Sequence, residues 1–145
     1  MNDPTGADGI SKRLEQLARD MGNTVNNGIV KTANDVRNDA IISISREQSS
    51  GAVYTRGSIT HLASAPGDAP NTDTGNLVRN IAVENPRNGL AFVGTSVEYG
   101  QYLEFGTRSM DARPWLRPAM DKNQSKLQSN ITNAIKEEIS KVSKL

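Results

Sequence analysis

Apolar residues recur at intervals of three or four along the first third of the chain, with polar and charged residues between them. This spacing is typical of one face of an amphipathic helix, which we expect over residues 9–45. Without a break, this helix would be roughly 55 Å long, more than one small domain can cover. Two glycines and three asparagines between Gly22 and Gly28 lower helix propensity, so a kink or break there stays open. The apolar positions are Ile10, Leu14, Leu17, Met21, Val25, Ile29, Ala33, Val36, Ala40 and Ile44.

The middle of the chain, residues 51–95, changes to a pattern typical of strands. Residues 52–63 are enriched in β-branched and aromatic types around Gly57, which predicts a hairpin or a projecting β-loop. Residues 81–85 and 90–95 flank an Asn-Gly dipeptide that suits a tight turn, so we expect a second antiparallel pair. Between the pairs, a Pro-rich loop precedes a short helix over 75–80, which Asp73 or Thr74 can cap.

The last third predicts a short helix and a long one. Aromatic and apolar residues at helical spacing indicate a helix over 98–105, which Gly106 ends. A terminal helix is expected over 117–145, although Asn123 and Gln124 make its first turns polar. We therefore predict one α+β domain spanning 1–145, in which two long helices and shorter helices pack on a small antiparallel β-sheet.

Charge and composition narrow the range of partners. A formal net charge of +1 offers no bulk attraction for nucleic acid or an anionic membrane, so protein partners are expected. The absence of cysteine excludes disulfides and thiol nucleophiles. Residues 1–9 have neither a basic nor an apolar signal-like segment, and no apolar run is long enough to span a bilayer. These features predict a soluble, cytoplasmic chain without membrane contact.

Catalytic and metal-binding chemistry find little support in the sequence. His61 is the sole histidine, so a Ser-His-Asp triad would need Ser58 or Ser64 together with Asp68 or Asp73. Those residues lie in turn-rich sequence without the strand-turn-helix context of a nucleophile elbow. The carboxylates are scattered and show no metal-ligand spacing. We therefore predict a non-enzymatic protein without catalytic residues, metal site or cofactor.

Residues 97–120 hold four of the six aromatic residues and two of the six prolines. They include Glu98-Tyr-Gly-Gln-Tyr-Leu-Glu-Phe-Gly-Thr107 and Met110-Asp-Ala-Arg-Pro-Trp-Leu-Arg-Pro-Ala119. This segment resembles the tail-component family of tailed bacteriophages that act at the head-to-tail junction. The upstream run Ser64-Ala-Pro-Gly-Asp-Ala-Pro-Asn-Thr-Asp-Thr-Gly-Asn-Leu77 is similar to a second block of that family. With the order of helices, the resemblance covers most of the chain.

The resemblance implies an α+β structural protein of the virion that is assembled in the host cytoplasm. Its expected form is a homo-oligomeric ring, hexameric or dodecameric, between portal-side connectors and the tail tube. The partners that it implies are other phage neck and tail proteins, with DNA passing through the ring without sequence-specific binding. Whether the role is that of a neck, tail-completion or tail-terminator protein stays open. A helical adaptor and a DNA-packaging accessory protein are the alternatives.

The same segment supplies the candidate subunit interface. For Glu104-Phe-Gly-Thr107, the alternative is a helix end with Phe105 buried and Gly106 at positive φ. Trp115 and Leu116 could anchor an interface or plug the core. The candidates are Tyr99, Tyr102, Glu104, Phe105, Gly106, Thr107, Arg108, Arg113, Pro114, Trp115, Leu116, Arg117 and Pro118.

Charged and aromatic residues suggest two further contacts. Arg108, Arg113 and Arg117 could pair with carboxylates of a neighbouring subunit, contact DNA phosphates or remain solvated, and we favour pairing between subunits. The hairpin over 51–64 could contact a neighbour by strand addition. Its candidate residues are Tyr54, Arg56 and His61.

Overall fold

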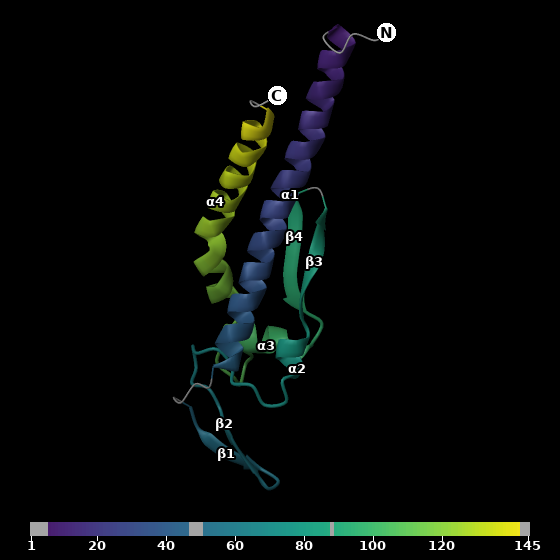
Figure 1. The fold of residues 1–145 in the computed structure, drawn as a ribbon. Coiled ribbons are helices and arrows are strands. Elements are labelled where there is room, and N and C mark those ends of the chain that lie inside the picture. Colours follow the sequence, from purple (N-terminus) through teal and green to yellow (C-terminus); the bar gives the residue numbers. More distant parts are fainter. Residues whose placement is uncertain (1–5, 47–50, 88, 143–145) are drawn as a thin grey trace.

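Two long helices run side by side and form the body of the molecule (Figure 1). The computed structural model describes residues 6–46, 51–87 and 89–142. One hairpin packs along the first helix, two short helices lie across one end, and a second hairpin extends beyond them. The helices are α1 (Ala7–Ser45), α2 (Asn76–Arg79), α3 (Tyr99–Phe105) and α4 (Arg117–Val142), and the strands are β1 (Val53–Arg56), β2 (Ile59–Leu62), β3 (Ile81–Arg87) and β4 (Leu90–Thr95).

Helix α1 is continuous over 39 residues and passes through the Gly- and Asn-rich stretch without a break. At Gly28 it packs closely on α4, where a Cβ atom would lie 3.4 Å from Ile131 Cγ1. The Thr32 hydroxyl donates a hydrogen bond to the Gly28 carbonyl at 3.0 Å. Tertiary packing therefore holds this stretch helical although the propensity of its residues is low.

The strands form two separate antiparallel hairpins, β1–β2 and β3–β4, in the part of the chain that the structure describes. The α+β class is confirmed: β3–β4 is the antiparallel pair expected over 81–95, and β1–β2 is the separate hairpin expected over 51–64. In the second hairpin Ile81 lies opposite Thr95, and the register shifts between Glu84 and Arg87. The turn places Gly89 at φ 81°, as the Asn-Gly dipeptide predicts.

The core lies where α1, α2, β3, α3 and the start of α4 meet. Ile44 and Ile81 are almost completely buried there, and Trp115 is 3% exposed. The other buried members of the cluster are Val36, Ala40, Leu77 and Ala119. The core thus occupies one end of the helix pair, close to the hairpin β1–β2 (Figure 1).

Hydrogen bonds between side chains join α1 to α4 beyond this core. Asp39 accepts hydrogen bonds from Lys122 Nζ at 2.8 Å and from Asn123 Nδ2 at 2.6 Å. Asn130 Nδ2 donates to Thr32 Oγ1 at 3.0 Å. Asn123 is fully buried, so the polar first turns of α4 that the sequence shows are part of the helix–helix contact.

Helix α2 begins differently from the sequence expectation. Its N-cap is Gly75 at φ 72°, a left-handed conformation that glycine adopts readily. Thr74 Oγ1 accepts a long hydrogen bond of 3.4 Å from the Asn76 N–H group. The Asp73 carboxylate instead faces the hairpin β1–β2, so the predicted capping role of Asp73 is wrong.

Candidate assembly surfaces

Glu104 ties α3 to the start of α4. Its Oε2 atom accepts hydrogen bonds from the N–H groups of Trp115 and Leu116, each at 2.8 Å. Its Oε1 atom accepts a third from the N–H group of Arg117 at 2.9 Å. The first N–H groups of a helix have no partner within the helix, and a carboxylate also matches the positive end of the helix dipole. Glu104 therefore acts as the N-terminal cap of α4 from a position in another helix.

Trp115 fills the space between α3 and α4. Its indole Nε1 donates to the carbonyl of Gly100 at 3.1 Å. Gly100 is itself buried, and a Cβ atom there would lie 2.6 Å from Thr95 Cγ2. Trp115 thus packs in the core of its own chain, as the core-plugging alternative expects, with Leu116 half-buried beside it.

The end of α3 combines a hydrogen-bonded backbone turn with an exposed ring. Gly106 ends the helix at φ 75°, as predicted, and its N–H group donates to the Tyr102 carbonyl at 2.9 Å. The adjoining turn is closed by a bond of 2.8 Å from the Thr107 N–H group to the Met110 carbonyl. Phe105, however, is 80% exposed, so the alternative in which it is buried is wrong. With Tyr99 and Tyr102, each about 40% exposed, it gives α3 an aromatic outer face.

The three arginines of the motif differ in their surroundings. Arg113 Nε donates to the Ser64 carbonyl at 3.1 Å and so fastens the Pro-rich loop to the α3–α4 connection. Arg108 and Arg117 have exposed side chains, as does Pro118 in the first turn of α4, whereas Pro114 is half-buried. Arg108 and Arg117 are therefore the two arginines that a neighbour can reach without disturbing the fold.

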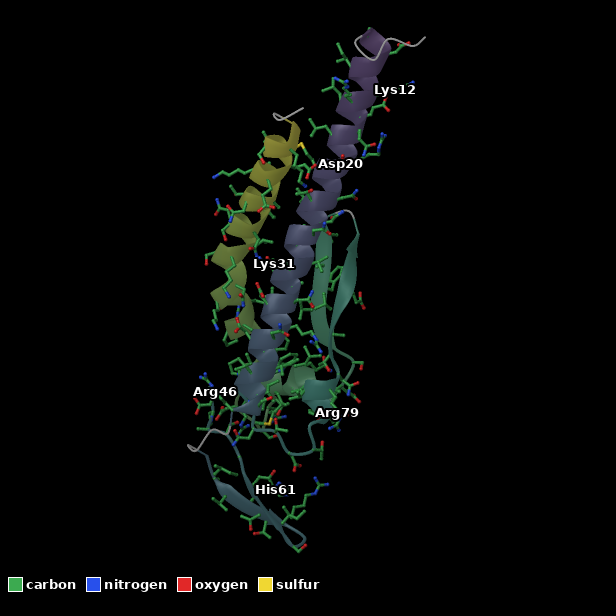
Figure 2. All side chains as sticks on the ribbon, in the orientation of Figure 1. Lys12, Asp20, Lys31, Arg46, His61 and Arg79 are labelled. Carbon is green, nitrogen blue, oxygen red and sulfur yellow. The ribbon has the colours of Figure 1, made fainter. Side chains whose placement is uncertain are left out.

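The hairpin β1–β2 extends from the core end of the molecule, where Figure 2 shows His61. The rings of Tyr54 and His61 stack with their centroids 5.4 Å apart. His61 Nδ1 lies 2.9 Å from Asp73 Oδ1, and an Arg56 nitrogen lies 3.8 Å from Asp73 Oδ2. Asp73 therefore connects the hairpin to the Pro-rich loop.

These contacts do not build a catalytic triad on Ser64. The Ser64 hydroxyl is buried and makes no hydrogen bond, so it does not bond to His61. The geometry that defines a triad requires this nucleophile–base bond. Within residues 6–46, 51–87 and 89–142, no three metal-ligating side chains gather in one place. No helix in those ranges has the length and apolar character to cross a bilayer.

An open apolar groove of about 570 Å³ lies between α1, β4 and α4, and we call it the three-element groove. Its floor is α1, with Ala33 and Val36. Phe92 of β4 is 63% exposed at one wall, and Met120 of α4 is 55% exposed at the other. Sequence analysis did not identify this groove, because its three sides come from segments far apart in the chain.

Residues 7–106 match the family described as "Bacteriophage HK97-gp10, putative tail-component". The chain belongs to this HK97-gp10-like family. The match covers α1, both hairpins, α2 and α3, including the Pro-rich loop and the Glu104-Phe-Gly106 run. Searches of curated proteins and of solved structures each found no match.

Membership in the HK97-gp10-like family confirms the resemblance to a phage tail component and supports a structural role in the virion. The groups that sequence analysis missed are Glu104 as a helix cap and the pair Asp39 and Asn123 between α1 and α4. Glu104 caps residues 11 to 13 positions further along the chain. Capping patterns in sequence extend over only about three residues, so no local signal indicates this bond.

Proposed function

We propose that this HK97-gp10-like protein forms a homo-oligomeric ring, hexameric or dodecameric, at the head-to-tail junction of a tailed phage. There it completes or terminates the tail and joins it to the head. The proposal rests on family membership together with one structural observation, the large apolar side chains that a single copy leaves exposed to water. The protein acts by association with its own copies and with other neck and tail proteins.

The exposed apolar side chains lie on separate parts of the molecule. Phe105 on α3 is 80% exposed, Phe92 on β4 is 63% exposed, and Leu14 on α1 is 61% exposed. On α3 the exposed rings of Tyr99, Tyr102 and Phe105 lie together, and grouped apolar side chains mark interaction sites more often than single ones do. Distinct surfaces on one chain favour a heterologous contact between copies, which gives a ring when the rotation closes.

A ring at the junction lets DNA pass without binding a sequence. The chain has 17 basic and 16 acidic residues, so it lacks the large positive excess of most DNA-binding proteins. Arg108 and Arg117 instead form ion pairs with carboxylates of a neighbouring subunit in this proposal. A guanidinium group can donate two parallel hydrogen bonds to one carboxylate. We infer that the motif residues Tyr99, Tyr102, Phe105, Thr107, Arg108, Arg117 and Pro118 form part of the subunit interface, with Tyr54, Arg56 and His61 on a second one.

The mass of the purified protein tests ring formation, measured by light scattering and by electron microscopy of the same sample. We expect the double variant Arg108→Glu, Arg117→Glu to assemble less than the wild type, because reversed charges repel the partner carboxylates. Lys136→Glu is the matched control, since Lys136 is also an exposed cation but lies far along α4. Unchanged assembly of the double variant would count against the arginines as interface residues.

Electron microscopy of particles made without this protein tests its place in the virion. Abnormally long tail tubes would indicate that it terminates tail growth. Normal tails detached from filled heads would indicate that it joins the two. Intact particles of normal tail length would contradict both roles.

A further inference from the structure

The N-terminal end of α1 has little cover from the part of the chain that the structure describes. The first turns of α1 extend beyond the end of α4 and beyond the hairpin β3–β4 (Figure 1), and we call residues 7–17 the overhang. All of these residues are exposed except Gly9 and Leu17, which are half-buried. Figure 2 shows Lys12 on this part of the helix, at the opposite end of the molecule from His61. Ile10 is 53% exposed and Leu14 is 61% exposed. The overhang therefore presents an exposed apolar helix face that a partner can cover.

The overhang has the pattern of a helix that binds in a groove. Ile10, Leu14 and Leu17 follow the spacing i, i+4 and i+7, which places them on one face. Arg13 flanks this face, one helical turn from both Ile10 and Leu17. The apolar face spans seven residues, or about 10 Å at 1.5 Å per residue.

The three-element groove matches this face in length and in charge. The α1 floor of the groove runs from Ile29 to Val36, and its α4 wall runs from Met120 to Leu127. Each of these two stretches also spans seven residues. Its lining, within the described residues, is apolar except for three uncharged polar side chains and the carboxylate of Asp121. Arg13 at the edge of the overhang face is the opposite charge to Asp121, and such complementarity fixes the register of a contact.

The overhang and the groove floor belong to the same continuous helix. The overhang therefore cannot fold back into the groove of its own chain. The Asn130–Thr32 bond shows which part of α1 faces this part of α4. Leu14 lies 18 residues before Thr32 along α1, a distance of about 27 Å, so it is remote from Leu127 in one copy. Only another copy of the chain can bring the two together.

We propose that the overhang of one copy inserts Ile10, Leu14 and Leu17 into the three-element groove of the next copy, with Arg13 paired to Asp121. This contact rests on the proposed ring and identifies the surfaces that build it. It is heterologous, because overhang and groove are different parts of the chain. Each copy gives one overhang and receives one, so repetition covers both surfaces on every copy.

Crosslinking between introduced cysteines tests the contact directly, because the natural chain contains no cysteine. The variant Leu14→Cys, Leu127→Cys is treated with a short bismaleimide, both as purified oligomer and in phage particles. We expect a ladder of covalent multimers on a denaturing gel. The matched control is Leu14→Cys, Gln128→Cys, in which the second cysteine is exposed on the adjacent face of α4 and should give no ladder.

Charge reversal gives a second readout. Asp121→Arg alone should lower the oligomeric mass, and adding Arg13→Glu should restore it. Both residues are exposed, so circular dichroism of the variants should match the wild type. This contact would be overturned if the oligomers give no crosslinked ladder and their mass is the same in the wild type and in both charge variants. That result would leave the proposed function standing. A wild-type protein that is monomeric even in particles would overturn the proposed function itself.

Discussion

At the scale of single residues, two carboxylates hold the first turns of α4 against the rest of the fold. Glu104 accepts three backbone N–H groups at the start of α4. Asp39 accepts the side-chain donors of Lys122 and Asn123 one turn further along. The segment 97–120 therefore first connects α3 to α4. The same hydrogen bonds hold its backbone in place, so its exposed residues have a fixed position from which they can contact partners.

Glu104→Ala should lower the free energy of unfolding by about 1–2 kcal/mol, because the start of α4 loses its cap. Urea unfolding followed by circular dichroism measures this change. Gln101→Ala on the same helix is the control, since Gln101 is exposed and should have little effect. A loss for Glu104→Ala no larger than that of the control would show that the cap contributes nothing.

The lowered pKa of Asp39 leads us to expect that the free energy of unfolding depends on pH in the acid range. The hydrogen bonds from Lys122 and then Asn123 lower the pKa of the Asp39 carboxyl below its ordinary value of 3.8. A group with a lowered folded pKa stabilises the fold above its unfolded pKa and loses this contribution as pH falls through the folded pKa. Unfolding free energies of the wild type and Asp39→Asn should therefore differ at neutral pH and converge below pH 3.8. A gap that stays constant into strong acid would contradict this origin.

At the scale of elements, the single helix α1 contributes residues to the core, forms the floor of the three-element groove and ends in the overhang. Its buried residues lie between Gly28 and Ile44, where α4 and the hairpin β3–β4 pack on it. The first part of the same helix has no such cover. The stability of α1 must therefore fall toward its N-terminus, where intrinsic propensity matters most.

Gly22→Ala should raise the free energy of unfolding by about 0.5–1 kcal/mol, since alanine costs less backbone entropy in a helix. A Cβ atom at this position meets nothing within 4 Å. Circular dichroism at the helix band and urea unfolding measure the gain. Gly57→Ala should instead destabilise, because Gly57 has φ 66° in the hairpin turn. A loss of helicity on Gly22→Ala would indicate that α1 is interrupted there.

At the scale of the whole molecule, the two extended parts lie at opposite ends of the chain's fold, and the core is close to only one of them. The overhang is at one end and the hairpin β1–β2 is at the other (Figure 1). An isolated two-stranded hairpin is only marginally stable in water, and every residue of β1 is exposed. Both ends therefore offer structure that neighbouring molecules can cover.

Shortening the hairpin should separate folding from assembly. Val53 lies opposite Leu62, so replacing residues 54–61 by Asn-Gly can close the loop with a tight turn. We expect the monomer to keep its helical circular dichroism and the ring to assemble less completely in light scattering. His61→Ala, which keeps both strands, is the control for loss of the Asp73 contact. Full assembly of the shortened chain would exclude the hairpin from the subunit interface.

The sequence by itself determined the elements whose signals are local. Apolar spacing indicated both long helices, the Asn-Gly turn indicated β3–β4, and Gly106 indicated the end of α3. These patterns depend on residues a few positions apart, and the backbone preferences of those residues act over the same distance. The family blocks in the sequence likewise indicated the phage tail component that the match to residues 7–106 shows.

Only the tertiary structure decided which residues meet. It made α1 continuous through Gly28 because Ile131 packs there, and it exposed Phe105, whose burial the sequence left open. It also assigned Glu104 to the cap of α4 and formed the three-element groove from distant segments. Burial and hydrogen bonding depend on contacts between parts far apart in the chain, and no local pattern specifies those contacts.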